Sequence, residues 1–227
     1  MVTDATFISK VRDEFHNDNW LYHPNPIVRR LEKNRREAIE RTVISFVPEN
    51  AIGLDVGCGN GHIAHHITQK KKVTIIGVDG NPDLLEQARK RIANFSTIMA
   101  DARSIPLEEK VDFIYCGCIL SHVTDPEKII QEFRRLIKES SVVIIQIPND
   151  TLLLFVKKVV KVLRLQFLFP KIELQLTRDH VQPFTFLKLS QLIKDTFVIR
   201  KKIAAGIFFL PFYWIAVLEP KSSRDTK

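Results

Sequence analysis

The sequence is poor in cysteine and has no long uninterrupted hydrophobic run. Its 227 residues include three cysteines, an odd number set in apolar segments, so no disulfide framework is expected. The longest apolar stretch, residues 152–169, contains four cations that a membrane-spanning helix would have to desolvate, so we expect no span there. The N-terminal residues lack the basic, apolar and small-residue order of a secretory leader. A cytoplasmic protein in a reducing environment fits best.

Glycine and proline are also scarce, at 8 and 11 residues, and no segment repeats at a fixed period. Collagen-like, low-complexity and solenoid architectures are therefore excluded. A hydrophobic share of 45% is enough for one packed globular domain. The net charge of +8 would suit a nucleic acid, an anionic membrane or a solvated surface. The early basic segment 29–41 also carries Glu32, Glu37 and Glu40, so we expect a compensated, solvated helix face there.

From residue 51 onward, short apolar segments alternate with helical ones. Strands are predicted at 51–56, 73–78, 97–100, 111–116 and 142–147. Helices are predicted at 63–70, 82–93 and 126–138, the last opened by Asp125. A further helix at 184–194 precedes two strands, 197–203 and 212–219, which should be antiparallel because no helix joins them. The alternation predicts an α/β fold, a doubly wound and mostly parallel sheet covered by helices.

Four of the eight glycines lie between Gly53 and Gly61, directly after a predicted buried strand and before a helix. Glycines at 57, 59 and 61 allow a sharp turn and let a ligand approach main-chain N–H groups, which indicates a nucleotide-type site. A phosphate-binding P-loop would need Lys followed by Ser or Thr where His62 begins the next helix. A dinucleotide site would have a glycine at His62 and no acid at Asp55. The carboxylate of Asp55 would instead attract an ammonium group.

Acidic residues end three successive predicted strands. Asp55 is the first, and Asp79 follows twenty-four residues later at a position suited to accept hydrogen bonds from ribose hydroxyls. Asp101 ends the third strand, where its carboxylate can accept from an adenine amino group. One such acid is commonly a solvated strand terminus, but three together with the glycine turn favour an adenosine-containing ligand.

These motifs resemble the class I S-adenosylmethionine-dependent methyltransferases, and in particular their small-molecule, type 11-like group. Residues 54–61 resemble the first motif of the family, 77–79 the second and 99–106 the third. The resemblance covers residues 45–150 and again 180–197. It implies a Rossmann-like methyltransferase fold with an antiparallel last strand, and S-adenosylmethionine as cofactor with S-adenosylhomocysteine as product. Ser140 and Ser141 depart from the Pro-Gly-Gly turn common before strand five.

The resemblance also implies a set of cofactor contacts. Cys116 and Gly117 should offer main-chain carbonyls near the methionine moiety. The predicted cofactor-binding residues are Asp55, Gly57, Cys58, Gly59, Gly61, Asp79, Gly80, Asp101, Ala102, Cys116 and Gly117. His122, in the loop after strand four, is the candidate general base, beside the alternative of a loop histidine that only packs or caps.

The sequence of the predicted site suggests two further interpretations, a metal site and methylation of a nucleic-acid base. Cys58, Cys116 and Cys118 with a nearby histidine have the atom types for a metal, but their spacing is unusual for zinc, so no metal is expected. The segment 116–119 lacks the Asn or Asp followed by Pro-Pro-aromatic of enzymes that methylate exocyclic amines of bases. We therefore expect a small-molecule or lipid-like acceptor, methylated on oxygen or carbon, and no nucleic acid. A protein methyltransferase or a non-catalytic cofactor-binding module is the alternative.

The remaining predictions concern the domain boundaries and the regions outside the core. Residues 1–48 are predicted as a helical lid, in which Trp20 and Tyr22 cover the pocket or only anchor the first helix. The core is predicted at 49–150, an apolar and basic cap insert with His180 at 151–183, closing elements at 184–220 and a tail at 221–227. Within the insert, Lys157, Lys158, Lys161 and Arg164 would share one helix face. That helix is predicted either as an ordinary cap or as a peripheral contact with an anionic membrane.

Overall fold

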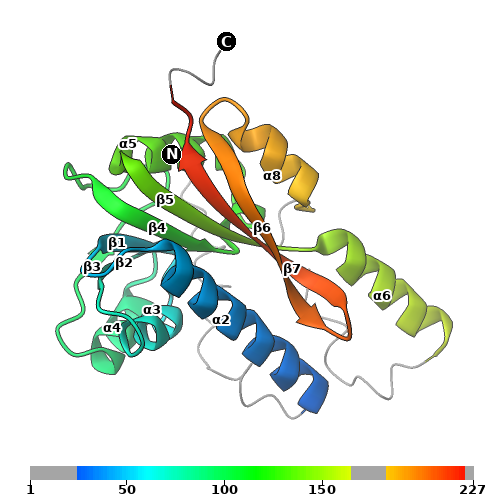
Figure 1. The fold of residues 1–227 in the computed structure, drawn as a ribbon. Coiled ribbons are helices and arrows are strands. Elements are labelled where there is room, and N and C mark those ends of the chain that lie inside the picture. The colour runs from blue at the N-terminus through cyan, green and yellow to red at the C-terminus, as the bar shows by residue number, and fades with distance from the viewer. Residues whose placement is uncertain (1–24, 165–182, 223–227) are drawn as a thin grey trace.

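The structure, a computed structural model, describes residues 25–164 and 183–222. A seven-stranded sheet in the order β3-β2-β1-β4-β5-β7-β6 forms its centre (Figure 1). The strands are β1 Ile52–Val56, β2 Thr74–Asp79, β3 Thr97–Met99, β4 Val111–Gly117, β5 Ile137–Pro148, β6 Phe197–Ile207 and β7 Leu210–Pro220. The helices are α2 Pro26–Phe46, α3 His62–Thr68, α4 Pro82–Arg91, η1 Ile119–Ser121, α5 Pro126–Leu136, α6 Asp150–Val162 and α8 Phe186–Ile193. The predicted fold class is confirmed.

Strands β1 to β5 pair in parallel, whereas β7 is antiparallel to both β5 and β6. The two closing strands are therefore antiparallel neighbours, as predicted. Because β7 is antiparallel to both of its neighbours, β5 and β6 run in the same direction. Strand β6 is therefore parallel to β1 to β5. The carboxyl ends of all six of these strands consequently lie at one edge of the sheet, which we call the carboxyl edge.

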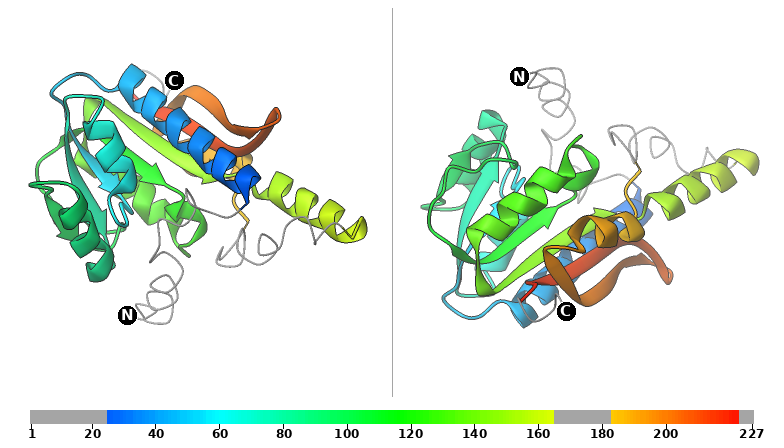
Figure 2. Two further views of the ribbon diagram at one scale, coloured as in Figure 1. Left: turned by 90° about the horizontal axis from the view of Figure 1, so that it is seen from below. Right: turned by 90° about the horizontal axis from the view of Figure 1, so that it is seen from above.

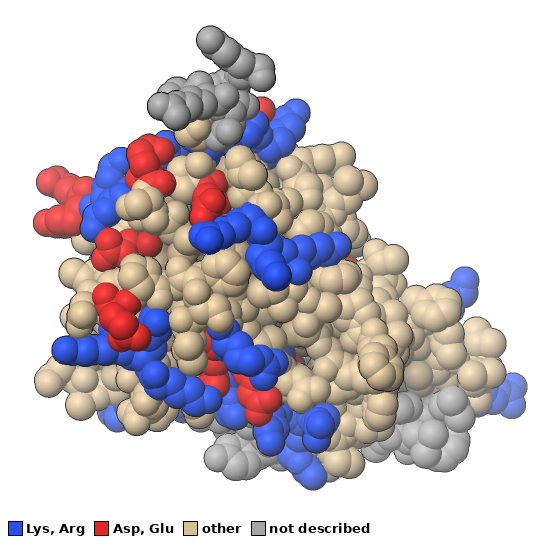
Figure 3. Space-filling view, in the orientation of Figure 1, with Lys and Arg blue, Asp and Glu red and all other residues tan. Residues whose placement is uncertain are grey.

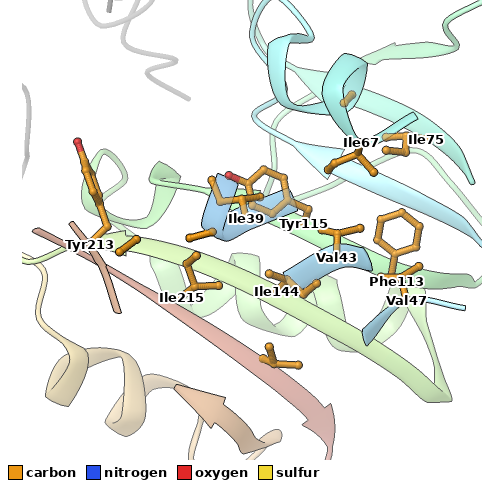
Figure 4. Packing of buried hydrophobic residues seen from close by; sticks show 14 of the residues in the cluster. Ile39, Val43, Val47, Ile67, Ile75, Phe113, Tyr115, Ile144, Tyr213 and Ile215 are labelled. Carbon is orange, nitrogen blue, oxygen red and sulfur yellow. The ribbon is translucent and has the colours of Figure 1, made fainter. Parts of the chain in front are cut away.

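Helices cover both faces of the sheet (Figure 2). Successive residues of β4 alternate between the two hydrophobic layers, Phe113 and Tyr115 facing α2 and α3, and Ile114 and Cys116 facing α5 and α8. Figure 4 shows the first of these layers, in which Ile39 and Val43 of α2 lie over the sheet. Because both faces are covered, the central strands are apolar throughout instead of alternating with polar residues.

Two helices begin with the same pair of residues. Asn25 precedes Pro26 at the start of α2, and its side-chain oxygen accepts from the Ile27 and Val28 amides at 2.8 and 3.4 Å. Asn81 precedes Pro82 at the start of α4 and accepts from two amides in the same way. An asparagine cap followed by proline fixes both helix starts. Asp125 occupies the corresponding position of α5, but its side chain makes no cap hydrogen bond.

The basic segment of α2 is solvated only in part. Arg29, Arg30, Lys33 and Arg41 are exposed, as the sequence predicts, and the charges are compensated as expected. Glu32 and Glu40 are instead buried against the sheet and α3. Glu40 pairs with Arg36 and with Lys70, and Glu32 accepts from Arg35 Nε at 2.7 Å. A pattern of alternating charges does not distinguish surface ion pairs from pairs that lie in an interface.

The side chain of Ser141 stabilises the start of β5, where the family that the sequence resembles commonly has a Pro-Gly-Gly turn. Its hydroxyl accepts from the Lys138 amide at 3.0 Å and donates to the Val111 carbonyl at 2.7 Å. These two bonds take the place of ladder bonds where the register between β4 and β5 shifts. Strand β5 therefore begins directly at the end of α5.

Candidate functional site

The glycine turn joins the carboxyl end of β1 to α3. Gly57, Gly59 and Gly61 all have left-handed backbone conformations, with φ of 75°, 52° and 73°. The amides of Gly57 and Cys58 donate to the Val78 carbonyl at 2.7 and 3.1 Å, so the turn stays attached to the neighbouring strand β2. Only glycine adopts three such conformations in five residues without strain, which explains the concentration of glycine seen in the sequence.

The three glycines have different surroundings. A Cβ atom on Gly57 would overlap the Ile119 side chain, and one on Gly61 would lie 3.0 Å from the Ala88 Cβ. These two glycines therefore permit close packing inside the protein. A Cβ on Gly59 would meet no atom of residues 25–164 and 183–222 within 4 Å, so the space over Gly59 is open to a ligand on this part of the chain.

Two carboxylates lie beneath the turn, the buried Asp55 and the partly buried Asp79. Asp79 accepts from the Gly59 amide through Oδ2 and from the Asn81 amide through Oδ1, both at 2.9 Å. Asp55 is only 3% exposed, and its Oδ2 has no hydrogen-bond partner among the described residues. Burial, with a smaller contribution from the neighbouring Asp79, raises the pKa of Asp55 to about 7. The site thus lacks a positive group opposite Asp55.

The raised pKa makes a testable prediction about stability. Because the folded-state pKa of Asp55 lies above the ordinary value, its contribution to stability is complete below about pH 4 and is lost as pH rises through about 7. The free energy of unfolding should fall by at most about 1.4 kcal/mol per pH unit in this range on account of Asp55. Urea unfolding at a series of pH values should show this decline in the wild type and not in Asp55→Asn.

Asp112 provides the control, because the Ile52 amide and Lys138 lower the pKa of its carboxyl group instead. Asp112→Asn should therefore retain the decline between about pH 4 and 7. Equal pH profiles for the wild type and Asp55→Asn would contradict the prediction.

Asp101, Ala102 and Gly80 lie at the ends of β3 and β2, on the same carboxyl edge. The carboxylate of Asp101 is 43% exposed and already accepts from the amide and the guanidinium of Arg103. The Arg103 side chain holds the pKa of Asp101 below its usual range. A hydrogen bond from an adenine amino group would therefore be an additional contact of this carboxylate.

The carboxyl end of β4 is held by a polar network that the sequence analysis missed. The fully buried Gln146 of β5 receives hydrogen bonds on Oε1 from Arg35 Nη1 and from the Tyr115 hydroxyl, both at 3.1 Å. Its Nε2 lies 3.0 Å from Cys118 Sγ, and its carbonyl accepts from the Cys118 amide at 2.9 Å. Gln146 therefore fixes the Cys116–Gly117–Cys118 turn, in which Cys118 has a φ of 59°. A single glutamine in the otherwise apolar segment 142–147 was the available signal.

Arg35 connects this network to α2. Its Nε bonds Glu32 Oε2, and the other oxygen of Glu32 accepts from the Tyr213 hydroxyl at 3.2 Å. Burial opposes the charge of Arg35, but Glu32 and the surrounding groups nevertheless raise its pKa. Burial likewise raises the pKa of Tyr115 and Tyr213 well above the ordinary value, so both hydroxyls stay protonated and donate.

The remaining predicted residues divide into three groups. Cys58 and Cys116 are buried free thiols whose pKa burial raises, so neither is a reactive thiolate. His122 follows η1 at the end of β4, and its amide donates to the Ile119 carbonyl at 2.8 Å; its role as a base stays a prediction. Trp20, Tyr22 and His180 lie outside the described residues.

The histidines proposed as alternative metal ligands contact arginines. His62 Nδ1 lies 3.1 Å from Arg91 Nη1, and His66 Nε2 lies 3.3 Å from Arg36 Nη1. Within residues 25–164 and 183–222, no group of three or more His, Cys, Asp or Glu side chains is arranged to hold a metal ion.

Solved structures share this architecture along almost the whole chain. The N-methyltransferase NodS from Bradyrhizobium japonicum WM9, in complex with S-adenosyl-L-homocysteine, has a TM-score of 0.67 at 15% identity, covering 95% of this chain and 99% of that one. Magnesium protoporphyrin IX methyltransferase from Synechocystis PCC 6803, with bound S-adenosylhomocysteine, has a TM-score of 0.66 at 18% identity and covers 95% and 100%. The fold is therefore the Rossmann-like fold of methyltransferases.

Sequence comparison assigns the family. The family model described as a methyltransferase domain matches residues 49–183, and the chain belongs to this family. Trans-aconitate 2-methyltransferase from Enterobacter sp. (strain 638) is 34% identical over 98 residues, which are 43% of this chain and 39% of that protein. Ubiquinone biosynthesis O-methyltransferase from Actinobacillus pleuropneumoniae serotype 5b (strain L20) is 32% identical over 126 residues, 48% of this chain and 53% of that protein. The chain thus spans about half or less of the length of these curated relatives.

Proposed function

We propose that the chain transfers a methyl group from S-adenosylmethionine to oxygen or carbon of a small-molecule or lipid-like acceptor. The observation that carries the proposal is the pair of carboxylates beneath the open Gly59 turn, the buried Asp55 and the partly buried Asp79. Membership of the methyltransferase domain family supports the same chemistry.

The residues present fit the cofactor. The unpartnered Oδ2 of Asp55 needs a positive donor, which the α-ammonium group of the methionine moiety supplies. Asp79 is already oriented by two amides and has lone pairs left for ribose hydroxyls. The open space over Gly59 lets the cofactor contact the main chain. Asp101 with Ala102 would contact the adenine, and the carbonyls of Cys116 and Gly117 the methionine moiety.

The chemistry asks little of the protein beyond alignment and exclusion of water. S-Adenosylmethionine supplies a methyl group that its sulfonium already activates for in-line displacement. The contribution of the chain is to bind and orient both reactants at the carboxyl edge. If the acceptor atom is a hydroxyl oxygen, His122 at the end of η1 is the candidate to accept its proton.

Asp79→Ala tests the cofactor site. Loss of the charge-assisted bonds to the ribose should weaken S-adenosylmethionine binding by about 1.5 to 3 kcal/mol, which is roughly 10-fold to 150-fold in the dissociation constant. Isothermal titration calorimetry measures the change, and Asp79→Asn repeats the test with less disturbance of the turn. Glu86→Gln, an exposed carboxylate on α4, is the control and should bind like the wild type. An unchanged dissociation constant in both Asp79 variants would refute the assignment.

The acceptor class needs a separate experiment. A panel of quinol, lipid, sugar and peptide acceptors, assayed with methyl-labelled S-adenosylmethionine, should show label in an extractable small molecule or lipid. Label in a protein band would favour a protein methyltransferase. Tight cofactor binding without turnover on any acceptor would favour the non-catalytic module.

A further inference from the structure

The turn between β6 and β7 presents large apolar side chains to solvent. Ile207 pairs with Leu210, so the hairpin loop consists only of Phe208 and Phe209. Phe208 is 76% exposed, Phe209 is fully exposed, and Leu210 is 42% exposed. Three adjacent exposed apolar residues at a hairpin tip are unusual for a surface in contact with water alone.

The backbone conformation of this turn does not favour phenylalanine either. Phe208 and Phe209 have φ of 50° and 65°, the left-handed conformations that a type I′ turn requires at both central positions. Asn-Gly is the favoured pair for such a turn, whereas bulky residues are disfavoured there. The two side chains thus serve neither the turn nor the core, and their exposure requires another explanation.

Helix α6 extends the same apolar surface. It begins beside the hairpin, where Asn149 bonds the Phe212 and Pro211 carbonyls at 2.8 and 2.7 Å. Leu153 is buried, but Leu154 and Phe155 are 47% and 63% exposed. Figure 1 shows α6 projecting away from the sheet near the hairpin tip. The helix ends at Val162, so Arg164 follows the helix instead of sharing its face as predicted.

The charges around this surface have one sign. Lys158 and Arg164 are exposed, and residues 151–164 contain no acid. On the other side of the hairpin, Asn34 of α2 donates to the Gly206 carbonyl at 2.9 Å, and the exposed Arg30 lies one helical turn nearer the N-terminus. Figure 3 shows Lys and Arg side chains on both sides of the tan hairpin region, with no Asp or Glu between them.

We propose that this docking surface, formed by Phe208, Phe209, Leu210 and the exposed residues of α6, binds an anionic phospholipid membrane. Apolar side chains at a protruding tip can enter the headgroup region, and flanking cations attract anionic lipids. The charged side chains that flank this surface are Lys and Arg. A second copy of the chain would carry the same cations and repel them, whereas an anionic lipid surface would attract them. No helix within the described ranges is long and apolar enough to cross a membrane, so the contact proposed is peripheral.

The position of the docking surface has a consequence for the reaction. Because β6 runs in the same sense as the parallel strands, its end at Ile207 lies at the carboxyl edge, as does the glycine turn. If the proposed function holds, a lipid-soluble acceptor would reach the site from the membrane. This consequence rests on the proposed function, whereas membrane binding does not.

Co-sedimentation with phosphatidylcholine vesicles, with and without phosphatidylserine, tests the proposal in the absence of cofactor. The wild type should bind the anionic vesicles at low salt and release them at high salt. Phe208→Asn with Phe209→Gly should reduce binding at least about tenfold, because two aromatic side chains no longer enter the lipid. The melting temperature of this variant should equal or exceed that of the wild type, since Asn-Gly suits the turn. Lys158→Glu with Arg164→Glu should weaken binding to anionic vesicles.

The matched control combines Lys194→Glu with Val198→Ser, two exposed residues near the opposite end of β6, Lys194 at the end of α8 and Val198 at the start of the strand. It should bind vesicles like the wild type. Calorimetry with S-adenosylmethionine separates the two proposals, because the Asn-Gly variant should keep the cofactor affinity of the wild type. Absence of wild-type binding at low salt, equal binding by the Asn-Gly variant, or a dimer that this variant abolishes would overturn the membrane assignment.

Discussion

Replacing Arg35 by methionine is expected to lower the free energy of unfolding by about 3 to 5 kcal/mol, because it leaves a buried carboxylate without its counter-charge. Glu32 lies against the sheet with Arg35 Nε at 2.7 Å, and it also accepts a hydrogen bond from the Tyr213 hydroxyl. Gln146 would lose one of its two donors as well. Urea unfolding monitored by circular dichroism measures the loss.

A second substitution distinguishes the loss of charge balance from the loss of packing. Glu32→Gln together with Arg35→Met removes both charges, and it should recover most of the stability that Arg35→Met loses. Lys33→Met is the matched control: Lys33 neighbours Glu37 on the solvent side of α2, and its removal should change stability by less than about 0.5 kcal/mol. If Arg35→Met behaved like Lys33→Met, the buried network would not hold α2 to the sheet.

The glycine turn provides the second large effect, because two of its glycines should respond differently to alanine. In Gly57→Ala the new Cβ overlaps Ile119 at a left-handed φ, so the free energy of unfolding should fall by about 2 to 5 kcal/mol. In Gly59→Ala the Cβ meets no atom within 4 Å, and only the backbone strain of about 1 to 2 kcal/mol applies.

In cofactor binding, Gly59→Ala should have a large effect although its effect on stability is small. Gly59→Ala places a methyl group in the open space over the turn, so the dissociation constant for S-adenosylmethionine should rise at least about tenfold while the protein stays folded. Thermal melts measure the stability of the two variants, and calorimetry measures their dissociation constants for S-adenosylmethionine. A Gly59→Ala protein that binds the cofactor as tightly as the wild type would place the ligand elsewhere.

Local sequence features predicted the sheet and the glycine turn well. Strand β4 appears in the sequence as a short apolar run, and the asparagine and proline pair at Asn81–Pro82 marks the start of α4. Both signals arise within a few residues, because burial on two faces and helix capping act locally. The positions of the carboxylates Asp55 and Asp79 at the carboxyl edge could be predicted for the same reason, because both are acids at the ends of apolar strands.

Features that depend on distant pairs were not predicted. Glu32 and Gln146 are 114 positions apart in the sequence, yet both contact Arg35. Nothing in the local pattern of α2 separates Glu32, which is buried, from Glu37, which is more exposed. Phe208 and Phe209 lie in the predicted connection between two strands, but their composition alone does not show that both side chains stand in solvent.

The strand order also has a consequence for synthesis of the protein. β7 is made last among the strands and yet lies between β5 and β6, where Ile215 to Leu218 are completely buried. Until the ribosome has released it, the edge of β5 is unpaired and presents main-chain groups that can pair with another chain. A nascent chain therefore exposes that edge until β7 has left the ribosome and can pair with β5.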